Sequence, residues 1–170
     1  GAPLLPDEPF DCHGVYSGSA LAEDGRIRVL YTGNVKLSDA DGTYDYVNTG
    51  RRADTVYVES IDGLAGREFS QKRVVLASDD YPEDLTCHVR DPKVWKKDDT
   101  YYMIQGARTK NDVGQALIFE SSDKINWHFR SRVESEKPFG YMWECPDYFE
   151  TDGIKILSSS VQGLEGKEWA

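Results

Sequence analysis

Short strands joined by tight acidic turns recur along the 170-residue chain, and this repeat limits the folds open to it. The turns Asp24-Gly25, Asp98-Asp99 and Asp152-Gly153 each precede a strand rich in aliphatic or aromatic residues. Pairs of this kind favour the two-residue turns of β-hairpins. Helical periodicity is nearly missing, whereas alternating runs bounded by Gly, Asp, Asn and Pro recur throughout. The chain is therefore predicted to be all-β.

A second hairpin is repeated between these turns, over residues 56–62 and again over 117–123. Each complete unit then holds four antiparallel strands, and such units arranged around one axis form a β-propeller. We expect a partial propeller domain over 1–170, with blades at about 14–76 and 89–133 and a half blade at about 143–160. A β-sandwich is the alternative fold for the same pattern.

Polar residues stand where the innermost strand of each expected blade begins. Counting back seven residues from the turn aspartates gives Ser17, Asp91 and Cys145, with Glu144 one step earlier. A proline follows both Asp91 and Cys145, and a proline in a sheet belongs on an edge strand or at a strand start. Since the first strands of successive blades line a central channel, these side chains are predicted to meet at one mouth.

Two carboxylates at one mouth are typical equipment for cutting a glycosidic bond. Glu144 follows the apolar residues 141–143, and apolar surroundings would raise its pKa towards that of a general acid. Asp91 follows Arg90, whose charge would favour the carboxylate form. Neighbours on a strand point to opposite faces, so that pairing requires a local bulge. Two solvated acids at strand ends are the simpler reading of the same spacing.

The net charge of −10, from 30 acidic and 20 basic residues, disfavours nucleic acids and anionic membranes as partners and suits a neutral sugar. Three widely spaced cysteines do not resemble a disulfide framework, which favours a cytoplasmic location. Cys12-His13 and Cys87-His88 lack the close spacing of a zinc site, so we expect no metal, and nothing suggests a cofactor. Open blade edges would permit self-association.

Several motifs, in order along the chain, resemble glycoside hydrolase family 32, which includes invertases, sucrose-6-phosphate hydrolases, levanases and inulinases. The resemblance spans nearly the whole chain. The motifs are Asp11-Cys12-His13-Gly14-Val15-Tyr16-Ser17-Gly18-Ser19-Ala20, Tyr31-Thr32-Gly33-Asn34, Arg90-Asp91-Pro92-Lys93-Val94-Trp95 and Gly140-Tyr141-Met142-Trp143-Glu144-Cys145-Pro146-Asp147.

The resemblance implies a five-bladed propeller, usually followed by a β-sandwich, that hydrolyses β-fructofuranosidic bonds of sucrose, sucrose 6-phosphate or fructan with retention. It implies Glu144 as the general acid and base and Cys145 as a residue that tunes it. Asp91 would hold fructose hydroxyls and stabilise the transition state. The family nucleophile is an aspartate in an Asn-Asp-Pro-Asn type motif, which this sequence lacks. The first blade would then precede Gly1, and the 170 residues alone would show little activity.

Further residues are expected to contact the sugar. Arg90 carries over with Asp91, and Tyr16 and Ser17 match an aromatic-serine pair that touches substrate in the family. His13 could contact a sugar hydroxyl, and Trp143 could stack on a sugar face, although an aromatic side chain in a strand is more often part of the core. Two rivals remain: another five-bladed glycosidase, acting on arabinose or xylose, and a sugar-binding module without catalysis.

Overall fold

The computed structural model describes residues 4–38 and 42–164. Within these residues the chain forms ten strands and two short 3-10 turns, Gly63–Ala65 and Ser78–Asp80, and no α-helix. None of the helical segments in this part of the chain has the length and apolarity needed to cross a membrane. The prediction of an all-β chain is confirmed.

The first two sheets are four-stranded and antiparallel, with the strands in sequence order. The first contains β1 (Val15–Glu23), β2 (Arg26–Lys36), β3 (Arg51–Glu59) and β4 (Arg73–Leu76). The second contains β5 (Leu85–Lys97), β6 (Thr100–Thr109), β7 (Gly114–Ser121) and β8 (His128–Val133). These are the four-stranded units that the repeat predicts.

The third sheet is a hairpin of β9 (Met142–Thr151) and β10 (Ile154–Gln162). Its turn has positive φ at both central residues, 51° at Asp152 and 76° at Gly153. The β1–β2 turn repeats this with 51° at Asp24 and 71° at Gly25. Two positive φ angles define the turn whose twist matches that of the flanking strands, which explains the Asp-Gly pairs.

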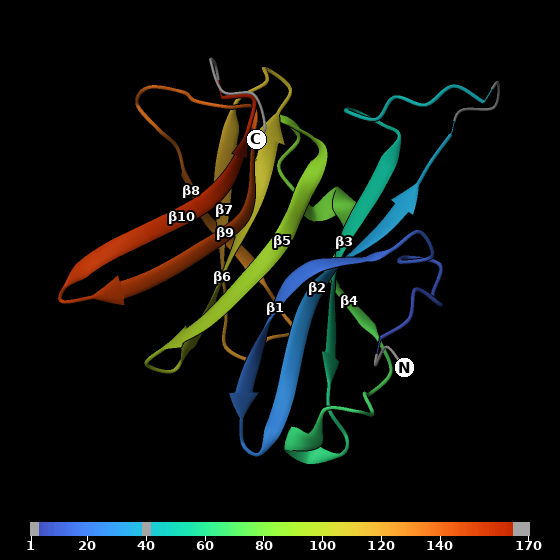
Figure 1. Ribbon diagram of the computed structural model, residues 1–170, viewed down its shortest axis with the longest axis vertical. Helices are drawn as coiled ribbons and strands as arrows, with labels where there is room; N and C mark the ends of the chain where they lie inside the picture. Colours follow the sequence, from blue (N-terminus) through green and yellow to red (C-terminus); the bar gives the residue numbers. More distant parts are fainter. Residues whose placement is uncertain (1–3, 39–41, 165–170) are drawn as a thin grey trace.

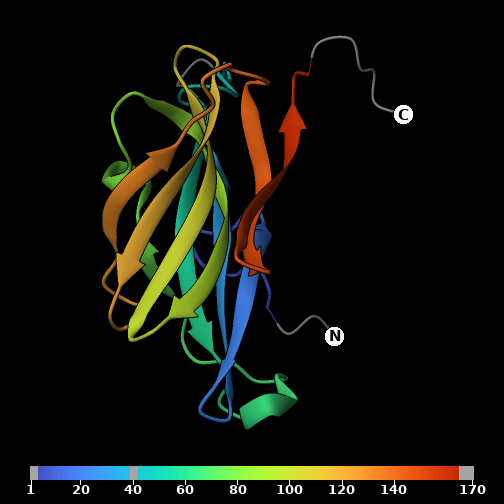
Figure 2. The same ribbon diagram turned by 90° about the vertical axis from the view of Figure 1, so that its left-hand side faces the viewer.

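The two complete sheets share one apolar core. Leu30 of β2 and Tyr57 of β3 pack with Met103, Leu117 and other buried residues of the second sheet. The strand β5 contacts both β1 and β9, and Figure 1 shows it between them. Figure 2 shows the β9–β10 hairpin as a separate layer beside the second sheet. This arrangement is consistent with part of a β-propeller, and the division into blades with the proposed limits stays a prediction.

Candidate active site

The first strand of each sheet carries a β-bulge at the same point of the repeat. The bulges fall at Ser17 in β1, at Asp91 and Pro92 in β5, and at Cys145 and Pro146 in β9. Asp91 and Cys145 have left-handed φ angles of 64° and 46°. Such a conformation costs a non-glycine residue about 1–3 kcal/mol and concentrates at functional sites, where surrounding contacts maintain it.

Those contacts come from the neighbouring sheets. The carboxylate of Asp91 accepts a hydrogen bond from the backbone N–H of Cys145 at 2.8 Å. The backbone N–H of Asp91 donates to the hydroxyl of Thr32 in β2 at 2.9 Å. Asp91 therefore joins all three sheets at their bulges, and its side chain has only 7% exposure.

The carboxylate of Glu144 is held at both oxygens. Arg90 donates to Oε1 from Nη2 at 2.7 Å and from Nε at 3.2 Å. Gln162 of β10 donates to Oε2 from Nε2 at 2.8 Å. Bonds to both oxygens fix the plane of the carboxylate, as a group that exchanges a proton with a substrate requires.

His88 lies beside Arg90, away from Glu144, and is buried with 2% exposure. Its Nδ1 lies 2.7 Å from Arg90 Nη1, and its Nε2 lies 2.9 Å from the backbone oxygen of Tyr46. A guanidinium can only donate and a carbonyl can only accept, so the imidazole is neutral with its proton on Nε2. Burial and the charge of Arg90 lower its pKa to about 4.

The charge of Arg90 acts on both carboxylates. It lies 3.9 Å from Asp91, where it lowers the pKa as the sequence predicts, but it is nearer to Glu144, at 2.7 Å. Burial raises the pKa of Asp91, although the Cys145 N–H and the Arg90 charge oppose this. The contacts of the Glu144 carboxylate are with a guanidinium and an amide, not with the apolar residues 141–143 that precede it.

The three bulges open onto one cavity of about 540 Å³. Six residues predicted for the site line it, together with four others. These are Tyr16, Ser17, Arg90, Asp91, Glu144 and Cys145, with Val15, Tyr46, Arg51 and Ser160. Burial, together with the nearby charge of Asp91, raises the pKa of the Cys145 thiol, which keeps that side chain neutral. The two carboxylates share a cavity, as the strand repeat predicts.

Two predicted site residues lie elsewhere. The indole of Trp143 is buried, stacks on Phe139 with ring centroids 4.9 Å apart, and packs in the core with Ile104. It points away because side chains alternate along a strand, and Glu144 is its neighbour. His13 Nδ1 lies 3.3 Å from Cys12 Sγ, and His13 does not line the cavity. No cluster that could hold a metal ion occurs within the described ranges.

Sequence reasoning missed several residues of the site. Tyr46 lies between β2 and β3, in a segment with no counterpart in the repeat, and Arg51 follows that segment as the first residue of β3. Ser160 and Gln162 lie on β10, where they face Glu144 across the hairpin. Pairing β10 against β9 from the turn at Asp152 would have placed Val161 opposite Glu144, because only the structure shows the bulge that moves Ser160 there. Arg51 left no signal either.

The described residues form successive antiparallel sheets that bring two carboxylates, Glu144 and Asp91, to one cavity, and paired carboxylates are typical of the glycosidase class. The chain belongs to glycosyl hydrolase family 32: the model of that family's N-terminal domain matches residues 1–169.

Relatives of known name are similar over nearly all of this chain. It is 42% identical over 167 residues to a sucrose-6-phosphate hydrolase of Bacillus subtilis, covering 95% of this chain and 32% of that protein. The solved sucrose-6-phosphate hydrolase of Lactobacillus gasseri has 30% identity and a TM-score of 0.77, covering 94% of this chain and 30% of that one. A β-fructofuranosidase of Bombyx mori has 33% identity and a TM-score of 0.72, with 90% and 30% covered. The chain thus spans about a third of these relatives.

Proposed function

We propose that the protein hydrolyses terminal β-fructofuranosidic bonds, with retention, in sucrose, sucrose 6-phosphate or fructan. One observation carries this proposal: Glu144 and Asp91 line a single cavity and are tied together through Arg90 and the Cys145 backbone. The names of the relatives, sucrose-6-phosphate hydrolase and β-fructofuranosidase, support the same activity.

Glu144 is assigned the role of general acid and base. It protonates the oxygen of the leaving sugar, then removes a proton from the water that releases fructose. Arg90 and Gln162 orient its two oxygens. Cys145 follows it on the bulge and, as a neutral thiol, tunes the proton donor without adding charge.

Asp91 is assigned to the fructosyl group. Its Oδ2 accepts the hydrogen bond of the Cys145 backbone, and Oδ1 is assigned to a sugar hydroxyl. A hydrogen bond from that hydroxyl strengthens as the ring gains positive charge in the transition state. Tyr16 and Ser17 border the same cavity and are assigned to substrate contact with Arg90. The nucleophile is assigned to a residue outside this chain.

The chain's three cysteines are free. Free thiols persist in reducing compartments, which supports a cytoplasmic location. The proposed partner is a small sugar, with no nucleic acid, metal or cofactor. Self-association through open sheet edges also stays a prediction.

The proposal is tested with Glu144→Gln in the protein at its full natural length. Release of fructose from sucrose and from sucrose 6-phosphate is measured, with substrate binding followed by calorimetry. The amide keeps the shape and loses the proton, so kcat should fall by about 10²–10⁴-fold while the Kd changes little. Glu150→Gln, at an exposed position of the same strand, should behave as the unaltered protein.

Three results would reject the proposal or part of it. Unchanged turnover in Glu144→Gln would remove the acid assignment. Sugar binding with no turnover by the unaltered protein would favour a sugar-binding module. Release of arabinose or xylose, with inversion, would favour the other class of five-bladed glycosidase.

A further inference from the structure

Arg51 is a buried cation on the wall of the cavity. The residue is only 7% exposed, and among the residues that the structure describes its Nε has no hydrogen-bond partner. No ion pair joins Arg51 to a carboxylate in residues 4–38 and 42–164. Arg90 in the same cavity is neutralised by Glu144 at 2.7 Å. The cavity therefore contains one guanidinium whose charge is balanced and one whose charge is not.

The fold places Arg51 facing the cavity. It is the first residue of β3 and pairs with Lys36 of β2. The next residue, Arg52, points to the other side of the strand, where its Nε lies 2.8 Å from Asp54. Alternation along the strand thus separates two adjacent arginines, one in an ion pair and the other on the cavity wall.

Two aromatic rings hold the Arg51 guanidinium in position. Its Cζ lies 4.6 Å from the ring centroid of Tyr46 and 5.7 Å from that of Tyr16. Cation–π contacts stabilise the charge, but ring faces leave the N–H donors without acceptors. Both tyrosines also line the cavity, so the donors stand at a wall that a ligand can reach.

The chemistry of this wall suits an anion. A buried, unpaired guanidinium is unfavourable, and an anionic ligand compensates it better than a neutral hydroxyl does. Its planar fork matches the oxygens of a phosphate, with two parallel hydrogen bonds. The net charge of −10 repels a phosphorylated sugar from the molecule as a whole, so binding one requires a local cation.

We propose that Arg51 binds the phosphate of a phosphorylated fructoside and selects sucrose 6-phosphate over sucrose. This inference rests on the proposed function. Of the three substrates proposed there, sucrose, sucrose 6-phosphate and fructan, sucrose 6-phosphate is the one defined by a phosphate group. The fructosyl unit occupies the end with Asp91 and Glu144, so the phosphate at Arg51 belongs to the leaving glucosyl unit.

The test compares Arg51→Gln, Arg51→Lys and Lys36→Gln with the unaltered protein, each at full natural length. Lys36 is the cross-strand neighbour of Arg51, is exposed and does not line the cavity, so it controls for the loss of one positive charge. The measured quantity is the ratio of kcat/KM for sucrose 6-phosphate to kcat/KM for sucrose, with thermal unfolding as the check on folding.

Arg51→Gln should lower kcat/KM for sucrose 6-phosphate by about 10–100-fold and change that for sucrose less than about threefold, since only the phosphate loses a charged donor. Arg51→Lys should retain an intermediate preference, because an ammonium keeps the charge but not the fork. Lys36→Gln should keep the full preference. An equal loss for both substrates, or no loss for either, would overturn the proposal.

A binding experiment separates this inference from the proposed activity. Glucose 6-phosphate and glucose are titrated into the unaltered protein and into Arg51→Gln by calorimetry. Arg51-dependent binding of the phosphorylated sugar alone supports the inference even if neither disaccharide is cleaved. Equal binding of glucose 6-phosphate by both proteins, or none by either, would reject it whatever the catalytic result.

Discussion

Single residues of the site act through their neighbours, and His88 is the plainest case. The imidazole contacts the Tyr46 carbonyl on one side and Arg90 on the other, and Arg90 contacts Glu144. Protonation would place a cation against the Arg90 guanidinium and remove the acceptor at Nδ1. His88 is therefore a positioning residue whose neutral form keeps Arg90 directed at Glu144.

This neutral form has a consequence for stability. The pKa of His88 is about 4 in the folded chain, against the usual 6.5. Between these values the unfolded chain binds a proton that the folded chain does not, so stability falls as the pH decreases from 6.5 towards 4. The loss between pH 7 and pH 5 should be about 2 kcal/mol. Denaturant unfolding at both pH values measures it.

His88→Gln should unfold with a flatter pH dependence, whatever its stability at pH 7, because the titrating group is gone. His128→Gln, at an exposed position, serves as the matched control and should retain the full dependence. Asp91 has the opposite effect on the pH dependence of stability, since its raised pKa makes stability fall as the pH rises above 3.8. Because Asp91 is present in the unaltered protein and in both variants, it does not affect the comparison. Equal pH dependence of His88→Gln and the unaltered protein would contradict the prediction.

The hairpins that begin each sheet were predicted from the sequence because the turn residues that signal them are local. Asp-Gly turns predicted two of the hairpins. The prolines after Asp91 and Cys145 were expected on edge strands or at strand starts. β5 is an edge strand, but both prolines lie inside their strands, at bulges, so the expectation of strand starts was wrong. The direction of Arg90 was not predicted, because a bulge turns side chains away from simple alternation and only the three-dimensional structure shows which acid is nearer. Arg51 was missed because the segment before it follows no repeat.

Close contact between backbones determines the position of β9 against β6. A methyl group on Gly106 of β6 would lie 1.7 Å from the carbonyl oxygen of Trp143 in β9. Neither atom belongs to a flexible side chain, so a larger residue must displace the strand. The residue after Trp143 is Glu144, and the docking of β9 on β6 therefore sets where the proposed acid stands.

Gly106→Ala should lower the free energy of unfolding by about 1–3 kcal/mol and reduce kcat more than substrate binding, because the strand that carries Glu144 shifts. Denaturant unfolding and steady-state kinetics of the protein at its full natural length measure the two effects. Stability and turnover equal to those of the unaltered protein would show that β9 does not approach β6 as closely as described.

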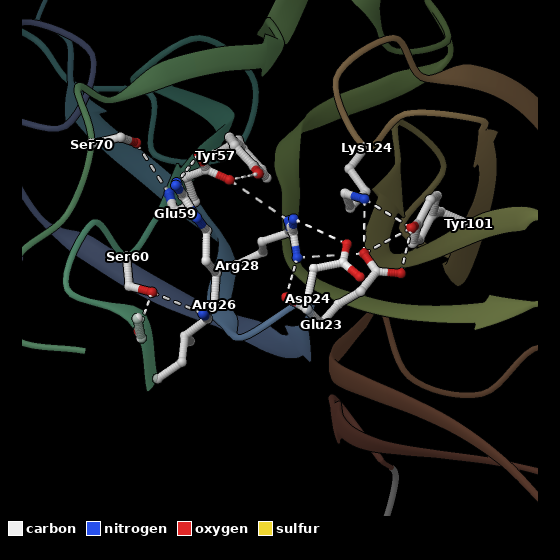
Figure 3. A network of polar contacts seen from close by, with 12 residues as sticks. Glu23, Asp24, Arg26, Arg28, Tyr57, Glu59, Ser60, Ser70, Tyr101 and Lys124 are labelled. Carbon is white, nitrogen blue, oxygen red and sulfur yellow. Dashed lines mark hydrogen bonds and ion pairs between the residues drawn. The ribbon is translucent and has the colours of Figure 1, made fainter. Parts of the chain in front are cut away.

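Across the whole molecule, the first two sheets are held together by charge as well as by the shared core. Glu23 at the end of β1 lies 2.9 Å from Lys124 and 3.0 Å from Lys96, both in the second half of the chain. Its carboxylate accepts hydrogen bonds of 2.6 and 2.8 Å from the hydroxyl of Tyr101 in β6. Figure 3 shows Glu23 between Lys124 and Tyr101 on one side and Arg28 of β2 on the other.

Self-association, by contrast, is expected to depend on open sheet edges and not on charged contacts. The strand β10 pairs with β9 on one side only within the described residues, and Ile154 on it is 62% exposed. An open edge with apolar side chains is a template for pairing with another strand. Self-association through open sheet edges, β10 among them, stays a prediction.

The Glu23 cluster should make the association of the two sheets sensitive to acid. The Tyr101 hydroxyl, then Lys124, lowers the pKa of Glu23 from 4.5 to about 2. Its contribution is therefore complete above pH 4.5 and is lost as the pH falls towards 2. The side chain is 19% exposed, so solvent screening limits this contribution to about 1–3 kcal/mol.

Glu23→Gln should lower the free energy of unfolding by about 1–3 kcal/mol at pH 7. It should also remove part of the loss of stability that occurs between pH 4.5 and pH 2. Glu68→Gln, at an exposed position in the loop between β3 and β4, should change neither, and denaturant unfolding across this pH range measures both variants. High salt should reduce the difference between Glu23→Gln and the unaltered protein, because the Lys96 side chain is 43% exposed and ions can reach the cluster. If Glu23→Gln matches Glu68→Gln at every pH, the Glu23 cluster does not contribute to holding the two sheets together.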